Sequence, residues 1–168
     1  MTPQIQPVDW NRPDHIEAFL LLLDTYSQDP LGGNAPLRPE VRQRLPEALQ
    51  NFPGAFSLIA WLDKQPVGLA NCFTGFSTFA ARPLINLHDL VVHPEFRGKG
   101  IGRQLLQEVE RQAQERGCCK ITLEVLNLNR TAFQLYLRSG FEGYSLDPQF
   151  GQALFLHKAM SPSGASKG

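Results

Sequence analysis

The sequence predicts an α/β (α+β) fold in which a mixed, mostly antiparallel central sheet carries helices on both faces. One observation is the order of the expected elements, β-α-α-β-β-β-α-β-α-β-β. A second is a strand–helix–strand unit in the middle of the chain, made of an apolar strand at Leu84–Val92, a helix that begins at Ile101 and a strand at Lys120–Leu126. Such a unit joins parallel strands, whereas the segments around it are expected to pair as antiparallel neighbours.

The chain opens with a short strand and a helix. The strand is expected around Ile5–Val8, and Asn11 and Pro13 then form a helix start signal. Apolar residues at helical spacing carry this helix to about Tyr26. The stretch 28–36 contains Asp-Pro and Gly-Gly-Asn and therefore predicts a loop.

A second helix and a hairpin follow. The spacing of apolar residues predicts a helix over Val41–Leu49, and Pro46 within it predicts that this helix is broken or irregular. Ala55–Leu62 is an apolar strand, and Val67–Phe76 is expected to return beside it after a short polar turn. The two segments therefore form one antiparallel hairpin of the sheet.

The C-terminal half contributes two more helices. The helix Ile101–Ala113 has one apolar face, and Gly117 is expected to end it. Another helix is expected over Thr131–Arg138. A final antiparallel pair is expected from Phe141–Leu146 and Ala153–Met160.

Length and charge limit what the chain can be. It has 168 residues, of which 42% are hydrophobic, so it can bury one proper core. We expect a single domain over residues 1–160 and a flexible tail over the small, polar residues 161–168. Sixteen basic residues balance sixteen acidic ones, and this balance argues against a nucleic-acid surface.

Targeting and metal-binding signals are also missing from the sequence. No run approaches the ~20 apolar residues of a membrane span, and the N-terminus lacks a signal-peptide pattern, so a cytoplasmic protein is expected. The three cysteines show no C-x-x-C spacing, and no His/Cys cluster suggests zinc. We therefore expect no metal, and we read the cysteines as small buried hydrophobes in a reducing compartment.

The stretch Arg97–Gly102 is the strongest chemical signal. It follows the apolar run Leu90–Val92 and opens the next helix. Glycines allow a phosphate to approach the backbone closely, and the unpaired N–H groups and dipole of a helix N-terminus favour an anion. Arg97 and Lys99 add positive charge at this place. The stretch therefore predicts that the chain binds a phosphate-bearing molecule.

The spacing of the glycines distinguishes between phosphate loops. The chain lacks the P-loop pattern, and Arg103 stands where a dinucleotide fingerprint needs its third glycine. What fits is R-x-x-G-x-G, which resembles the acetyl-CoA pyrophosphate loop of the GNAT superfamily of N-acetyltransferases. A second block, N-x-x-A-x-x-L-Y-x-x-x-G-F from Asn129 to Phe141, resembles that superfamily's C-terminal CoA-binding helix and the strand after it. The nearest pattern is that of the spermidine/thialysine-type small-amine acetyltransferases.

The resemblance implies a GNAT fold, which splays two parallel central strands apart and holds acetyl-CoA in the splay, here between Leu90–Val92 and Lys120–Leu126. It implies direct transfer of an acetyl group from acetyl-CoA to a primary amine of a small molecule, such as a polyamine or an amino-acid-like compound. A homodimer is common among such proteins. The residues expected to bind acetyl-CoA are Leu90, Val91, Val92, Arg97, Gly98, Lys99, Gly100, Ile101, Gly102, Asn129 and Tyr136.

The resemblance also suggests catalytic residues. Tyr136 is the candidate acid for the departing CoA thiolate, because many GNAT enzymes place this hydroxyl near the CoA sulfur. The base is either His88 or Glu124. A histidine can take up a proton near neutral pH. In spermidine/thialysine-type enzymes a Glu-Asp pair stands where this chain has His88 and Asp89, so a carboxylate base does not carry over directly.

The acceptor site is expected from the parts least like the family. Candidate substrate-binding residues are Asp24, Asp29, Phe76 and Asp89. Strand alternation predicts that His88 shares one face with Leu90, while Leu87 and Asp89 lie on the other. Two alternatives remain at this level, namely acetylation of protein N-termini or lysines and a non-catalytic acyl-CoA-binding domain.

Overall fold

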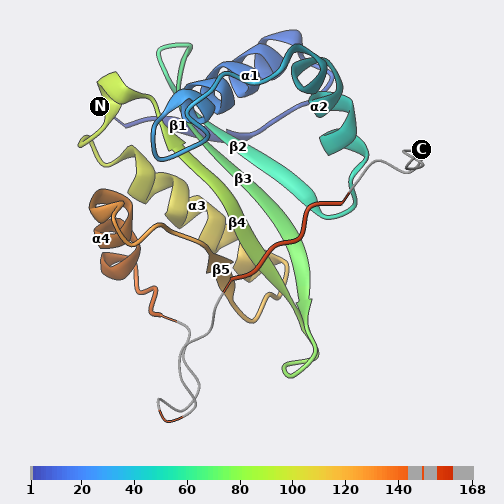
Figure 1. Ribbon diagram of the computed structural model, residues 1–168, viewed down its shortest axis with the longest axis vertical. Helices are drawn as coiled ribbons and strands as arrows, with labels where there is room; N and C mark the ends of the chain where they lie inside the picture. The colour runs from blue at the N-terminus through green and yellow to red at the C-terminus, as the bar shows by residue number, and fades with distance from the viewer. Residues whose placement is uncertain (1, 144–148, 150–154, 161–168) are drawn as a thin grey trace, which may run out of the picture.

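The computed structural model describes residues 2–143, 149 and 155–160, which form a five-stranded sheet and four α-helices (Figure 1). The strands lie side by side in chain order, and every neighbouring pair is antiparallel except the last, which is parallel. This confirms the mixed, mostly antiparallel sheet. The strands are β1 (Gln4–Pro7), β2 (Ala55–Leu62), β3 (Gln65–Ser77), β4 (Arg82–Val92) and β5 (Ile121–Leu123).

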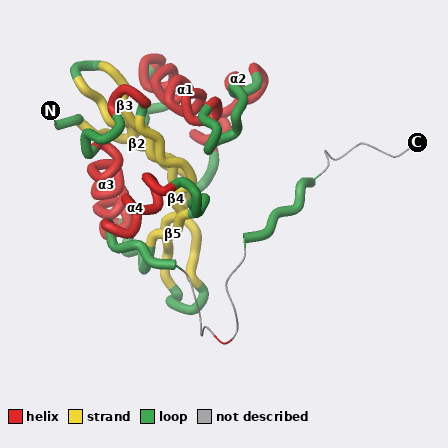
Figure 2. The backbone as a smooth tube through the Cα atoms, turned by 60° about the vertical axis from the view of Figure 1, so that its left-hand side comes forward, coloured by secondary structure: helices red, strands yellow, loops and turns green. Residues whose placement is uncertain are grey.

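Helices cover both faces of the sheet, as Figure 2 shows. On one face α1 (Pro13–Gln28) and α2 (Pro39–Asn51) pack against the sheet around Phe19 and Leu22. On the other, α3 (Ile101–Glu115) and α4 (Arg130–Arg138) enclose a second apolar core. Within the described part of the chain, none of these helices is long and apolar enough to cross a bilayer.

Helix α2 differs from the sequence prediction. It runs without a break from Pro39 to Asn51, although Pro46 lies inside it. A proline removes one backbone hydrogen bond from a helix. The packing of Leu45 and Leu49 against the core beneath α1 and α2 holds the helix together across that gap.

Gly68 lets α3 lie very close to the sheet. A Cβ atom at this position would stand 2.9 Å from Leu105 Cδ1 and 3.1 Å from Ile101 Cγ2. A larger residue would force these side chains, or the first turns of α3, to shift. The close contact places the N-terminus of α3 beside the end of β4, from which the chain reaches it through the short 3-10 turn Pro94–Phe96.

Strand β4 contains a bulge that the sequence prediction missed. Asn71 of β3 faces Asp89, but the next residue, Cys72, faces Leu87, so His88 is an extra residue in the ladder. A bulge shifts the side-chain alternation by one residue. The expected alternation is therefore wrong here, because Leu87 and Leu90 contact the same core on the α3 side.

The parallel strands separate soon after they pair. Their register joins Ile85 to Ile121, Asn86 to Thr122 and Leu87 to Leu123, and β5 ends there instead of reaching Leu126. The expected final antiparallel pair is wrong where it can be checked, because residues 141–143 and 155–160 have no strand. The remaining residues of that pair, 144–146 and 153–154, and the expected tail 161–168 lie outside the described residues. The early end of β5 opens the sheet between β4 and the segment after Leu123.

Candidate active site

A large cleft occupies the opening between β4 and β5. Its volume is about 1530 Å³, and its walls come from Leu87–Leu90 of β4, the segment 118–126 and helix α4. Beyond Leu87, the β4 edge that faces this cleft has no strand partner in the described part of the chain. Its backbone groups can therefore pair with an extended polar molecule, as a neighbouring strand would.

The stretch Arg97–Gly102, called the glycine turn below, follows β4 after the short 3-10 turn Pro94–Phe96. Gly98 and Gly100 have φ of +77° and +81°, a conformation that side chains rarely adopt, and a Cβ atom on either would meet no atom within 4 Å. Across the described residues, none of the backbone N–H groups from Gly98 to Arg103 donates a hydrogen bond to the protein. Open space, free donors and the N-terminus of α3 fit a phosphate group.

The two glycine-turn residues Ile101 and Gly102 have a structural part as well. Both are buried, and a Cβ atom on Gly102 would stand 3.1 Å from Leu135 Cδ2 of α4. Gly102 therefore allows α4 to pack on α3. The backbone N–H groups of these two residues donate to no other described residue.

Arg97 connects the glycine turn to the loop after α1. Its guanidinium donates to Asp29 Oδ2 at 2.9 Å and to the carbonyl oxygen of Val92 at 3.2 Å. The N–H of Leu31 and the Arg97 guanidinium together hold the pKa of the Asp29 carboxyl below its usual range. Lys99 lies over the Phe96 ring, with Nζ 4.7 Å from the ring centroid.

Helix α4 presents its N-cap residue and a buried tyrosine to the cleft. Asn129 caps the helix, since its Oδ1 accepts the N–H of Ala132 at 3.2 Å. Tyr136 is buried against Phe141, and its ring also lines the cleft. Burial raises the pKa of Tyr136 to about 12, with a smaller contribution from the nearby Tyr26. This hydroxyl therefore stays protonated at neutral pH.

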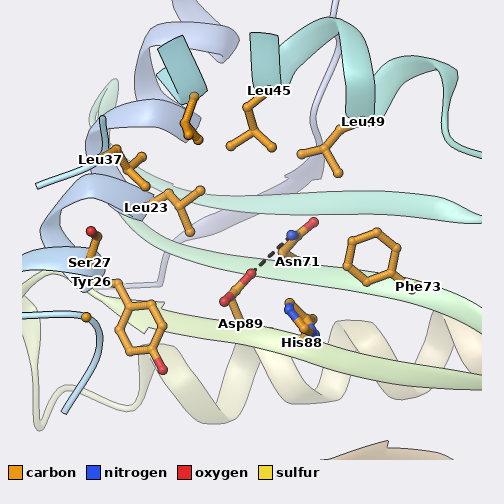
Figure 3. Close-up of a pocket in the computed structure, with 12 residues that line it drawn as sticks. Leu23, Tyr26, Ser27, Leu37, Leu45, Leu49, Asn71, Phe73, His88 and Asp89 are labelled. Atoms are coloured by element: carbon orange, nitrogen blue, oxygen red, sulfur yellow. Dashed lines mark hydrogen bonds between the residues drawn. The ribbon is translucent and has the colours of Figure 1, made fainter. Parts of the chain in front are cut away.

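A second, smaller cavity of about 390 Å³ lies on the other face of β4, beneath α1 and α2 (Figure 3). Its floor carries a chain of hydrogen bonds, in which Ser57 Oγ donates to Asn71 Oδ1 at 2.8 Å and Asn71 Nδ2 donates to Asp89 Oδ2 at 3.1 Å. Ser57 and Asn71 are both buried. Two buried side chains therefore fix the Asp89 carboxylate, Asn71 directly and Ser57 through Asn71.

The small cavity and the cleft share three residues, Tyr26, His88 and Asp89. The β4 bulge explains how two successive residues, His88 and Asp89, come to line the same cavity. Burial, followed by the charges of Asp89 and Asp29, raises the pKa of Tyr26. His88 and Asp89 of β4 thus border both the cleft and the small cavity.

The predicted base and acceptor residues fall in different places. His88 stands at the junction, where its ring meets Phe73 edge-on with centroids 5.4 Å apart. Glu124 is exposed and lines only the cleft. Phe76 is 64% exposed and lines neither cavity.

The two acids near α1 already have partners. Asp24 accepts the N–H of Leu37 at 2.7 Å and pairs with Arg42 at 3.2 Å. Asp29 pairs with Arg97. Of the four expected acceptor residues, Asp89 is the one that lines the small cavity.

Sequence reasoning did not find Ser57 and Asn71. Both are polar residues inside otherwise apolar strands, and this isolation is the signal that could have found them. A buried polar side chain needs a hydrogen-bond partner, and here the partners lead to Asp89.

Within the described ranges, no group of three His, Cys, Asp or Glu residues is placed to hold a metal ion.

Comparison with known proteins identifies the family. The model of the acetyltransferase (GNAT) family matches residues 19–141, and the chain belongs to this family. The thialysine N-epsilon-acetyltransferase of Bos taurus is 38% identical over 74 residues, which are 44% of this chain and 43% of that protein. The streptothricin acetyltransferase of Streptomyces lavendulae is 40% identical over 75 residues, 45% of this chain and 40% of its own length. The matched stretch thus spans less than half of these relatives.

The solved structures agree on the fold. An aminoglycoside acetyltransferase from an uncultured soil metagenomic sample, in complex with trehalose, has a TM-score of 0.76 at 16% identity, over 95% of this chain and 97% of that chain. The ribosomal-protein-alanine N-acetyltransferase of Brucella melitensis has a TM-score of 0.69 at 20% identity, over 94% of this chain and 99% of its own. The fold expected from the sequence is therefore confirmed.

Proposed function

We propose that the protein is an acyltransferase that moves an acetyl group from acetyl-CoA directly to the primary amine of a small molecule. The observation that carries this proposal is the meeting of two cavities at Tyr26, His88 and Asp89. Group transfer between two molecules needs both reacting groups in one place, and a shared border supplies that place. The similarity to the thialysine and streptothricin acetyltransferases supports the choice of an acetyl group.

The cleft and the glycine turn have the features that acetyl-CoA needs. The free N–H groups from Gly98 to Arg103 would hold its pyrophosphate, and the unpaired β4 edge at Leu90–Val92 would hold its extended arm. Asn129 and Tyr136 line the far wall of the cleft. When bound, acetyl-CoA supplies an activated thioester, whose acyl carbon is attacked by the amine and whose sulfur leaves.

The residues at the junction have distinct parts in this proposal. Asp89 attracts the ammonium of the acceptor, because it is a carboxylate held in a fixed position by Asn71. His88 takes a proton from that ammonium, which frees the lone pair for attack. Glu124, the other candidate base, lines only the cleft, so His88 has the better position.

Tyr136 acts on the leaving side. Its pKa of about 12 lies above that of an ordinary thiol near ~8.5, so complete proton transfer to a thiolate is uphill. The hydroxyl stabilises the thiolate by donating a hydrogen bond to it. Such a bond strengthens as negative charge develops on sulfur, and it therefore favours the transition state.

Two further properties belong to the same proposal, a cytoplasmic location and a homodimer. Cys72, Cys118 and Cys119 are free thiols, which suits a reducing compartment. Light scattering on the eluting protein tests the dimer, and the mass of a single chain would reject it.

The proposed activity is tested with purified protein, acetyl-CoA and a panel of amines, polyamines, aminoglycosides and peptides. The readouts are release of free CoA and the mass of the product. We expect one acetyl group on the primary amine of a small molecule. Transfer to peptides alone would favour a protein acetyltransferase. Tight acetyl-CoA binding without any transfer would favour a non-catalytic domain and reject the proposal.

A further inference from the structure

The charge in the small cavity differs from what the sequence pattern suggests. Of the three acids expected near the acceptor, Asp24 is paired with Arg42 and Asp29 with Arg97. Among the described residues that line the cavity, Asp89 is the one carboxylate. One of its oxygens accepts from Asn71, and the other accepts no hydrogen bond from the described residues. The cavity therefore offers one negative charge to a ligand.

The rest of the lining is mostly apolar. Side chains from α1, the following loop and α2 form the roof, and Phe73 stands on the floor beside His88, as Figure 3 shows. The apolar lining residues are Leu23, Leu37, Val41, Leu45, Leu49 and Phe73. A second ammonium or a carboxylate under this roof would lose its water without gaining a partner, which is costly. An uncharged carbon skeleton would gain from the same burial.

An aromatic row extends the apolar side of the cavity. Phe73 meets His88 with ring centroids 5.4 Å apart and meets Phe52 with centroids 5.6 Å apart, both edge-on. Phe52 is 56% exposed, so this row leads from the junction toward the surface. Flat or flexible apolar groups can pack along it.

We propose that the small cavity takes an amine with a single positive charge and an apolar body, with its ammonium against Asp89 and its carbon skeleton beneath α1 and α2. This inference rests on the proposed function and names the acceptor class for that same site. It differs from both acceptors that the resemblance implies, since a polyamine and an amino-acid-like compound each carry more than one charged group. The volume of about 390 Å³ lies in the ordinary range for a small-molecule site.

The test compares hexylamine with 1,6-diaminohexane, two amines of equal chain length that carry one and two charges. Binding is measured by calorimetry, with and without CoA, and transfer is measured as kcat/KM with acetyl-CoA. We expect hexylamine to bind more tightly and to react faster, in each case by at least ~10-fold. Equal or better values for the diamine, or for spermidine, would overturn the inference.

A charge added to the roof sharpens the comparison. Leu45→Glu places a second carboxylate in the cavity, and it should lower the preference for hexylamine at least ~10-fold, toward the diamine. Leu45→Gln is the matched control, which has a similar shape without the charge and should keep the wild-type preference. CoA affinity shows that both variants are folded. An unchanged preference in folded Leu45→Glu protein would place the amine elsewhere.

The binding measurement distinguishes a failure of this inference from a failure of the proposed function. Selective hexylamine binding without any acetyl transfer would reject the acetyltransferase and leave the ligand class standing. Acetyl transfer with no preference for the single charge would leave the acetyltransferase standing and reject the ligand class. If neither amine binds or reacts, in the presence or absence of CoA, the inference is wrong.

Discussion

Asn71 Nδ2 donates a hydrogen bond to Asp89 Oδ2 at 3.1 Å, across the point where a bulge interrupts the pairing of β3 and β4. Asn71 is buried and is itself fixed by Ser57. The bulge brings His88 to the same cavity as Asp89, and the buried amide of Asn71 sets the direction of the Asp89 carboxylate. In our proposal, these two residues on neighbouring strands determine where the ammonium of the acceptor binds.

Substitution of Asn71 tests this relationship. Asn71→Ala leaves Ser57 without its buried acceptor and frees the Asp89 carboxylate, so we expect a loss of stability of ~1–3 kcal/mol and a raised KM for the amine. Ser57→Ala loosens Asn71 but keeps its bond to Asp89, so it should raise KM less than Asn71→Ala does. Steady-state kinetics and denaturant unfolding of both variants provide the comparison. A KM equal to wild type in folded Asn71→Ala protein would remove Asn71 as a positioning residue.

Gly100→Trp should abolish acetyl-CoA binding, because the side chain fills the open space beside the free N–H groups. Gly117→Trp is a matched control, since Gly117 also has positive φ, +65°, and open space around it, but it lies at the opposite end of α3. Calorimetry measures both affinities. Unchanged acetyl-CoA affinity of folded Gly100→Trp protein would contradict the assignment of the glycine turn.

Arg97→Ala should weaken acetyl-CoA binding less than Gly100→Trp does. The Arg97 side chain is half exposed and already bonded to Asp29 and Val92, and exposed ion pairs typically contribute only ~0.2–1 kcal/mol. Asp29→Asn breaks the same pair from the other side and keeps the positive charge. If Arg97→Ala abolished binding while Gly100→Trp did not, the phosphate would lie at the arginine and not at the backbone.

Tyr136→Phe should lower kcat and leave acetyl-CoA affinity nearly intact. The ring keeps its packing against Phe141, and only the hydroxyl is lost. A hydrogen bond donated to charge that develops in the transition state contributes roughly 10²–10³-fold to kcat, and we expect the low end because a thiolate is a fair leaving group. Since the pKa of Tyr136 is about 12, the hydroxyl is protonated at every pH tested. The loss in kcat should therefore be the same from about pH 6 to about pH 10. A wild-type kcat across that range would leave Tyr136 as a packing residue.

The parts of the site that depend on local backbone chemistry could be predicted from the sequence. Gly98 and Gly100 adopt positive φ, and Asn129 caps a helix, and each of these conformations restricts the residue type. The β4 bulge could not be predicted in this way, because one extra residue leaves the apolar pattern Leu90–Val92 intact.

Ion pairs between separate segments of the chain determine which of the expected acids remain unpaired. Asp29 and Arg97 are far apart in the sequence, and only the folded chain shows that each neutralises the other. The same holds for Asp24 and Arg42. The sequence therefore suggests several acids for the acceptor, and the fold leaves Asp89 as the one that lines the small cavity.

In the proposed function, the cleft and the small cavity form one continuous site across Tyr26, His88 and Asp89. The most direct measurement is the affinity of a conjugate in which the nitrogen of hexylamine is joined through an acetyl linker to the sulfur of CoA. If the site is continuous, the conjugate should bind at least ~10²-fold more tightly than CoA alone, because the second part binds without a separate association cost. A conjugate that binds no more tightly than CoA would show that the two cavities do not act together, and the account would be wrong.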